Sequence, residues 1–387
     1  GSDCHGERRP RSFIASNNAV EGIAALTTRT DWRAEHGEEL AALLTPFLDS
    51  PSPTYRYLAI RALPGLHPEP DDLFGELQQR VLRETDRHVA TYLLSRLSRF
   101  RPSRANDIDS TLQQLAQLPA WACATSDPEA DHLDGRRDSW VLVVDLLTIL
   151  AVIHTTPYAD TVVRAWLTYP VDHPNRAAQA TACLRGVLKP ADDALRPAQE
   201  RAFQFLSLGM DQLRDTWVNR EQASQPTPEH QERVSSAVKV AENIGQQLYF
   251  ASGAADGTKA PNRPVPSGDL RRFSTFALPL IEKLSVIGYP AVTHHIVQTI
   301  DHLRPVQPRR GLMIAAHSAT NDPGYAREPL ALDAVHLLIR HYLADHRELV
   351  LSDPTCISSI RVMLEAFVRS GWDKAIALAE DLDSLFG

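Results

Sequence analysis

Apolar residues recur at three- and four-residue spacing along most of the chain, in stretches separated by short breaks of proline, glycine, aspartate or serine. This period places the apolar side chains on one face of a helix. Alternation of apolar and polar positions, which would predict strands, is scarce. The pattern therefore predicts an all-α protein built from packed helical hairpins.

The clearest hairpins lie in the N-terminal third of the chain. In the first, helical spacing covers residues 40–48 and 55–66, on either side of a Ser-Pro-Ser-Pro break at 50–53. In the second, it covers residues 73–82 and 89–100. The second helices of the two hairpins superpose at an offset of about 34 residues, which is the signature of an internal repeat.

The helix Ser-Pro-Thr-Tyr-Arg-Tyr-Leu-Ala-Ile-Arg-Ala-Leu at 52–63 resembles the repeat units of the HEAT and armadillo-like α-solenoid superfamily, and the resemblance extends over residues 38–100. It implies stacked hairpins that form an α-solenoid with an extended groove for a partner. Near the C-terminal end, Gly288-Tyr289 and Gly371-Trp372 are similar to the inter-helix turns of tetratricopeptide-like repeats.

The same period predicts further helices over 108–118, 139–154, 157–168, 175–188, 191–222, 228–251, 329–350 and 355–370. We divide the chain into an N-terminal lead-in at 1–30 that begins like a tag-cleavage scar, HEAT-like repeats at 31–190, a long helical hairpin at 191–251, a linker at 252–268 and a C-terminal helical repeat section at 269–387. The linker is assigned because its glycines and prolines prevent regular structure.

Composition narrows the class of protein. The 387 residues are 43% hydrophobic and 23% charged, and the formal net charge is −8, which is typical of a globular protein and does not by itself favour nucleic acid or anionic lipid. The longest apolar run, residues 140–153, is shorter than a bilayer span and contains Asp145. The four cysteines are far apart. We expect a cytoplasmic protein with reduced thiols and no membrane partner.

The sequence contains none of the motifs that would carry catalysis. The apolar stretch ending at Asp145 has no phosphate-binding loop to accompany it, and no Gly-x-Ser-x-Gly elbow is present. His294, His295, His336 and His341 could form a metal hydrolase site, but they lack a third ligand in register. We therefore predict no catalytic residues, no metal and no cofactor, and lean against an enzyme.

Arginine clusters are the most distinctive candidate sites, because guanidinium groups bind phosphates in bidentate fashion. They are Arg96, Arg99, Arg101 and Arg104 near the end of the second hairpin, Arg271 and Arg272, and Arg309 and Arg310. On the concave face of a solenoid they could follow a nucleic-acid backbone. Ordinary solvated helix ends would show the same pattern, since cations stabilise helix C-termini.

Two tryptophans, Trp32 and Trp121, lie in polar surroundings and are the candidate anchors for a protein partner. The leading hypothesis is a non-catalytic protein-binding scaffold or sensor region, a fragment of a larger multidomain bacterial protein of the defence or signalling type. The alternative is a nucleic-acid-binding HEAT-like protein, or a base-processing enzyme, that uses the arginine clusters on its concave face.

Overall fold

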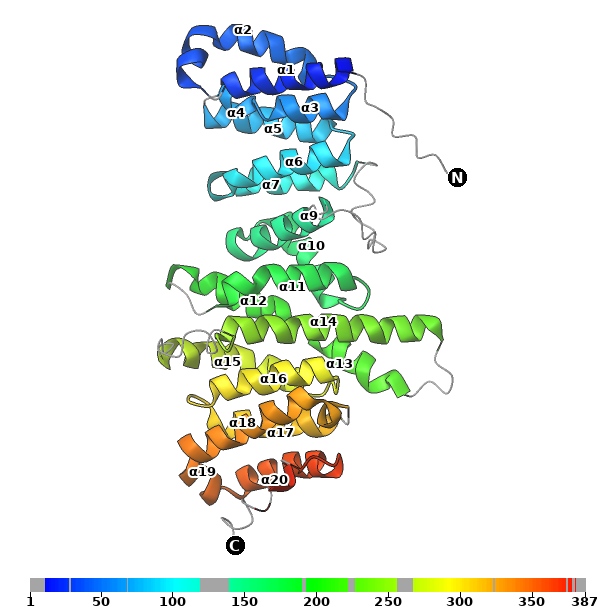
Figure 1. Cartoon of the computed structure of the whole chain (residues 1–387), viewed down its shortest axis with the longest axis vertical. Coiled ribbons are helices and arrows are strands. Elements are labelled where there is room, and N and C mark those ends of the chain that lie inside the picture. The colour runs from blue at the N-terminus through cyan, green and yellow to red at the C-terminus, as the bar shows by residue number, and fades with distance from the viewer. Residues whose placement is uncertain are drawn as a thin grey trace. The chain divides into compact units, whose positions relative to one another are not determined.

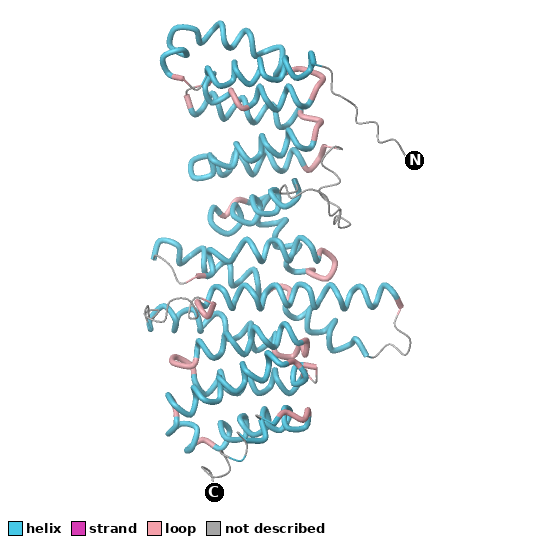
Figure 2. The backbone as a smooth tube through the Cα atoms, in the orientation of Figure 1, coloured by secondary structure: helices cyan, strands magenta, loops and turns pink. Residues whose placement is uncertain are grey.

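The computed structural model is helical in the residues that it describes, which are 11–27, 29–67, 69–118, 139–189, 193–221, 227–255, 267–322, 324–373, 375–377 and 380 (Figures 1 and 2). No strand occurs in these residues. The all-α class predicted from the apolar period is confirmed.

Proline sets many of the helix boundaries. A proline occupies the first position of the helices that begin at Pro53, Pro70, Pro157, Pro174, Pro228, Pro290, Pro308, Pro329 and Pro354. This position suits proline because its missing N–H would have no intrahelical partner there and its φ angle is already helical. The prolines thus start successive helices after short connections.

The chain divides into two compact units, residues 1–146 and 147–387. The first unit contains α1 (Arg11–Thr27), α2 (Thr30–Leu48), α3 (Pro53–Ile60), α4 (Leu63–Leu66), α5 (Pro70–Arg83), α6 (Arg87–Leu97), η1 (Ser98–Phe100), α7 (Arg101–Leu115) and the start of α9 (Ser139–Ile149). The predicted hairpins are α2 with α3 and α5 with α6. Residues 11–27 of the predicted lead-in form α1, which contacts α2 and α3.

The second helices of the two predicted hairpins lie against each other in the first unit. Helices α3 and α6, which begin at Pro53 and Arg87, contact each other, and α5 contacts α7. The helices therefore form two layers, with α1, α3 and α6 in one and α2, α5 and α7 in the other. Between the layers lies a core of fully buried leucines and aliphatic residues, including Leu44, Ile60, Leu77 and Leu93.

The second unit contains the end of α9, η2 (Leu150–His154), α10 (Pro157–Thr168), α11 (Pro174–Leu188), η3 (Asp193–Leu195), α12 (Arg196–Ser207), α13 (Met210–Val218), η4 (Asn219–Glu221), α14 (Pro228–Ser252), α15 (Ser267–Leu284), α16 (Pro290–Leu303), α17 (Pro308–Asn321), η5 (Tyr325–Arg327), α18 (Pro329–Asp345), α19 (Arg347–Ser352) and α20 (Pro354–Arg369).

Contacts between these helices again form two layers. One series runs through α11, α14, α16 and α18, and the other through α12, α15, α17 and α20. Helix α14 is 25 residues long, and its N-terminal end extends past α11 and α16 together with the end of α13 (Figure 1). In this projecting arm the first turns of α14 have no neighbouring helix of the same layer beside them, and most of their side chains are exposed.

Three predicted helices are broken in the structure. The span 55–66 is divided into α3 and α4, and the span 329–350 into α18 and α19. Of the span 191–222, the described residues 193–221 form η3, α12, α13 and η4 rather than one long helix, with a break at Gly209. A Cβ at Gly209 would lie 2.4 Å from the backbone oxygen of Leu167, so the chain there passes close to the end of α10. The close approach, which needs glycine, has no signature in the apolar period.

The two units meet between Leu146 and Leu147, within α9, whereas the composition suggested a boundary at 252–268. Most of that predicted linker lies outside the described residues. None of the described helices is by itself long and apolar enough to cross a bilayer, and one strongly bent pair, 140–154 with 157–168, meets the criteria of length and composition.

Candidate functional site

The arginine cluster predicted at 96–104 is split between the two layers of the first unit. Arg104 turns toward α5, where it pairs with Asp71, and also lies 3.4 Å from Asp107. Arg101 donates its Nε hydrogen to the backbone oxygen of Ser98 at 2.9 Å. These two guanidinium groups are therefore engaged within the chain.

Arg96 and Arg99 belong to the other side of the cluster. Arg96 lies over the ring of Tyr92, with 5.9 Å between the guanidinium carbon and the ring centroid. Arg99 is exposed, and its guanidinium has no hydrogen bond or ion pair with any residue that the structure describes. Of the four predicted arginines, Arg99 is the one most available to a ligand.

In the second unit, three of the four predicted arginines pair with carboxylates. Arg272 lies 3.5 Å from Asp269, one turn before it on α15. Arg309 lies 2.6 Å from Asp353, and Arg310 lies 2.6 Å from Glu282. The fourth, Arg271, is exposed. These pairs neutralise most of the positive charge that the sequence had suggested for phosphate binding.

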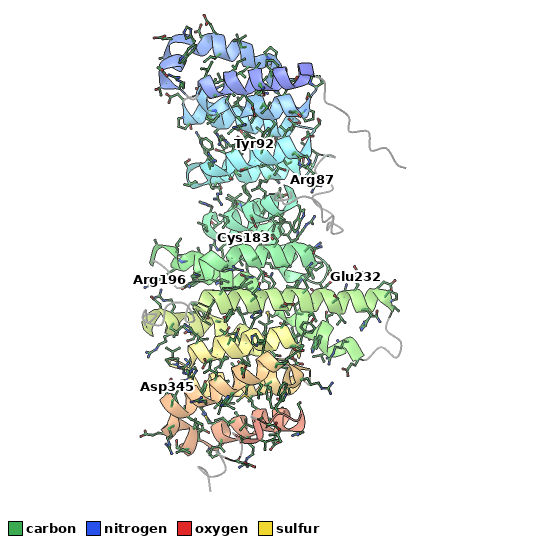
Figure 3. The ribbon with its side chains drawn as sticks, viewed as in Figure 1. Arg87, Tyr92, Cys183, Arg196, Glu232 and Asp345 are labelled. Carbon is green, nitrogen blue, oxygen red and sulfur yellow. The ribbon has the colours of Figure 1, made fainter. Side chains whose placement is uncertain are left out.

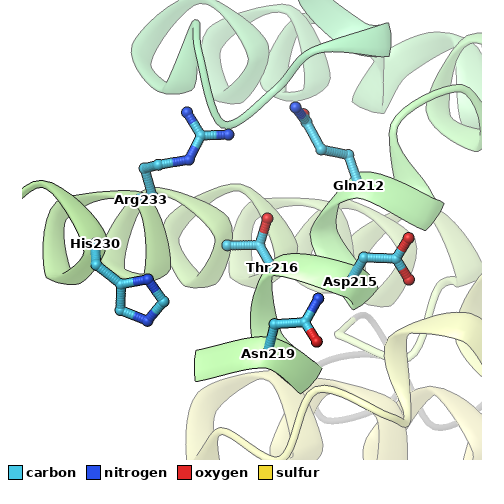
Figure 4. Close-up of a pocket in the computed structure, with 6 residues that line it drawn as sticks. All are labelled: Gln212, Asp215, Thr216, Asn219, His230 and Arg233. Carbon is cyan, nitrogen blue, oxygen red and sulfur yellow. The ribbon is translucent and has the colours of Figure 1, made fainter. Parts of the chain in front are cut away.

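An open pocket of about 470 Å³ lies on the projecting arm of the second unit (Figure 4). Its lining side chains come from α13, η4 and the first turns of α14: Gln212, Asp215, Thr216, Asn219, His230 and Arg233. These residues form no sequence motif. They come together only because the three consecutive elements α13, η4 and α14 pack against each other. The sequence reasoning missed this pocket.

Contacts within the chain already occupy the strongest polar groups of the pocket. Arg233 lies 2.8 Å from Asp172, and the Gln212 side chain accepts from the backbone N–H of Val171 at 3.3 Å. His230 Nε2 lies 3.1 Å from the backbone oxygen of Arg220. The pocket is open, and none of its lining residues is an aliphatic one or a phenylalanine, tyrosine or tryptophan, the types that predominate in sites for small organic ligands.

No group of three or more metal-ligating side chains is close enough to hold an ion in the part of the chain that the structure describes. The histidines proposed above as possible ligands have other environments. His341 Nδ1 lies 2.8 Å from Asp301, which also pairs with Arg304 at 2.9 Å. The rings of His294 and His295 lie 6.3 Å apart, and that of His295 lies 5.6 Å from Tyr249 on α14.

Comparisons with protein-family models, curated proteins and solved structures find no match to this chain. The assignment of a function therefore depends on the chemistry of its surfaces.

Burial, together with the smaller effect of the neighbouring His294, lowers the pKa of His295 to about 4. An unfolded histidine has a pKa near 6.5, so between these values the unfolded state binds a proton that the folded state excludes. Stability is therefore expected to fall as the pH is lowered from 7 to 5, by about 1 kcal/mol after allowance for the partly exposed ring.

Hydrogen exchange of α14 and α16 at the two pH values, after correction for the intrinsic exchange rates, measures this loss. His295→Phe, which cannot titrate, is expected to remove most of it. An unchanged pH dependence in His295→Phe would show that other groups are responsible. His36→Phe is the matched control, because His36 lies on α2 in the first unit with a side chain 40% exposed.

Of the two predicted tryptophan anchors, Trp32 is 41% exposed and its ring centroid lies 5.1 Å from that of His36. Trp121 lies outside the described residues. Trp372, in one of the tetratricopeptide-like turns, donates its indole N–H to the backbone oxygen of Ala326 at 2.7 Å. That tryptophan therefore anchors η5 within the fold.

The two most exposed leucines among the described residues of the second unit lie on α18, a helix for which the sequence predicted no site. Leu330 is 72% exposed and Leu337 is 50% exposed. The buried face of this helix includes Leu332, Val335 and Leu338. A signal was present in the sequence, because Leu330 and Leu337 stand seven residues apart and off that apolar face.

Proposed function

We propose that the chain is a non-catalytic protein-binding scaffold or sensor region, and that its partner contacts the outward face of α18. Helical hairpins packed in layers present many outward helix faces, which suits the recognition of an extended partner. The HEAT-like sequence of the first unit favours the same role.

The exposed face of α18 is the observation that carries this proposal. Leu330 and Leu337 lie two turns apart on it, and Asp333 and Arg340 are exposed beside them. Apolar side chains bordered by charges are typical of the centre and rim of a protein interface. A partner that covers the two leucines would remove apolar surface from water.

Affinity capture from a native lysate tests the proposal, with the eluate measured for both protein and nucleic acid at low and high salt. A stoichiometric protein partner is expected to survive high salt, because burial of apolar surface does not depend on counterion release. It should be lost with the double variant Leu330→Ser/Leu337→Ser and kept with Val218→Ser, a change at another exposed apolar residue.

Two results would contradict the proposal. One is the absence of a stoichiometric protein in the wild-type eluate. The other is a partner that the double variant retains, since the α18 face would then not hold it. Circular dichroism of both variants confirms that each change leaves the helical content intact.

The alternative of nucleic-acid binding through the predicted arginine clusters has less support. Arg104, Arg272, Arg309 and Arg310 pair with carboxylates of this chain, so phosphates would have to compete for them. Nucleic acid in the same eluate that disappears steeply with salt, and with Arg99→Glu, would favour it over the scaffold.

A further inference from the structure

Helices α3 and α6 of the first unit carry arginines but no aspartate or glutamate. Asp86, which precedes α6, accepts the backbone N–H groups of His88 and Val89 as a helix cap. Helices α5 and α7 of the other layer carry both signs, with five carboxylates and four arginines, and α1, in the same layer as α3 and α6, carries Glu21. Helices α3 and α6 are therefore a net positive part of a chain whose net charge is −8.

Tyrosine and arginine side chains alternate on the outward side of these two helices, which contact each other. An arginine follows a tyrosine by four residues in both places: Arg96 follows Tyr92 on α6, and Arg61, the residue directly after α3, follows Tyr57. The rings of Tyr57 and Tyr92 lie 4.9 Å apart in an edge-to-face arrangement. This contact joins the two helices into one surface, which we call the Tyr–Arg face; it comprises Tyr57, Arg61, Tyr92, Arg96 and Arg99.

The cations of the Tyr–Arg face are accessible. Arg99 is exposed and has no polar partner among the described residues, and Arg61 is 51% exposed with Glu21 at 3.6 Å. Arg96 rests against the Tyr92 ring, which leaves its N–H groups free to donate. Tyr92 and Arg87 both lie on α6, as Figure 3 labels them. The face thus presents guanidinium groups, each with several N–H donors, beside aromatic rings.

We infer that the Tyr–Arg face binds a short acidic segment of a protein partner. Carboxylates accept bidentate hydrogen bonds from guanidinium groups, and the tyrosine rings supply apolar contact between them. Arg96 and Arg99 match one or two carboxylates, and Arg61 adds a third donor only where the bound segment displaces its partner Glu21. Binding to a nucleic-acid backbone grows with the number of phosphates that lysine and arginine neutralise, and this face offers only three arginines. The inference depends on the proposed function only in taking the partner to be a protein, because it concerns a surface distinct from α18.

Fluorescence anisotropy of the full chain with a short labelled peptide of alternating glutamate and serine tests the inference. We expect saturable binding that weakens roughly tenfold or more in Arg99→Glu, because a charged donor becomes a like charge. Arg83→Glu is the matched control, since Arg83 is an exposed arginine of α5 in the other layer and the change in net charge is the same. It should leave the affinity within about twofold.

Three outcomes would overturn the inference: no binding of the glutamate peptide, equal binding of a peptide with lysine at every glutamate position, or equal weakening by Arg83→Glu and Arg99→Glu. Tighter, steeply salt-dependent binding of oligothymidylate, lost in Arg99→Glu, would also overturn it and assign the face to nucleic acid. Failure here is distinguishable from failure of the proposed function. If this test fails while the α18-dependent partner is still captured, only the Tyr–Arg inference is lost.

Discussion

Replacing Arg56 with alanine is expected to lower the free energy of unfolding of the first unit by about 3–5 kcal/mol. Arg56 lies on α3 and donates two hydrogen bonds, of 2.6 and 3.0 Å, to the carboxylate of Glu84, the residue after α5. It also donates to the backbone oxygens of Ser50 and Pro51 at 2.7 and 3.1 Å. One side chain therefore ties the connection within the first hairpin to that within the second.

The large effect follows from burial. The Arg56 and Glu84 side chains are 14% and 6% exposed, so removal of one leaves the other charge buried without its counter-ion. Glu84 also accepts the backbone N–H groups of Thr85 and Asp86 at 3.0 and 2.8 Å. Arg56→Lys should recover only part of the loss, because an ammonium group cannot reproduce the bidentate contact.

Hydrogen exchange of the full chain measures this effect locally, through the protection of residues 53–60 and 87–97. The control is Arg369→Ala, which breaks an exposed pair with Glu365 whose side chains are 77% and 49% exposed. That change should cost less than about 1 kcal/mol. Loss of protection in Arg56→Ala no greater than in the control would show that the ion pair does not hold the hairpins together.

The apolar period and the prolines allowed the helices to be predicted well, because both act locally. The predicted helix at 157–168 coincides with α10, the one at 175–188 begins one residue after α11, and the one at 355–370 is shifted by one residue from α20. Helices α3 and α6 begin at Pro53 and Arg87, each two residues before the predicted spans at 55 and 89, where a proline and a capping aspartate start them.

The candidate sites could not be predicted in the same way, because they depend on residues distant in sequence. The sequence shows Arg104, Arg309 and Arg310 as parts of basic clusters. Each meets a carboxylate that is between 28 and 44 positions away, on another helix or at its cap. Helical spacing fixes which face a side chain occupies but not which neighbouring helix covers it. For the same reason, the sequence could not predict that His295 is buried against Tyr249.

Asp322 offers the second large effect, at the turn that follows α17. Its carboxylate accepts the Thr293 hydroxyl at 3.1 Å and the backbone N–H groups of Gly324 and Tyr325 at 3.0 Å each. The chain at Gly288 packs tightly against the end of α17, since a Cβ at Gly288 would lie 2.2 Å from the backbone oxygen of Asn321. Asp322 thus fixes the path of the chain from α17 into η5.

Asp322→Ala is expected to cost about 3–5 kcal/mol, because it leaves three donors without their acceptor at a site where Asp322 is 2% exposed and Thr293 fully buried. Asp322→Asn should be close to neutral. The amide oxygen can accept both backbone N–H groups, and the amide N–H can donate to Thr293. Burial raises the pKa of the Asp322 carboxyl, so ionisation is disfavoured in the folded state and removal of the charge is not itself a loss.

The sign of the pH dependence separates the role of the charge from that of the hydrogen bonds. Because the folded pKa is raised, the folded state holds a proton that the unfolded state has released, and this contribution to stability is lost as the pH rises through the folded pKa. Asp322→Asn should abolish that dependence while keeping hydrogen-exchange protection in α16 and η5. If Asn reduced this protection as severely as Ala, the turn would require the carboxylate charge, and the hydrogen-bonding argument would fail.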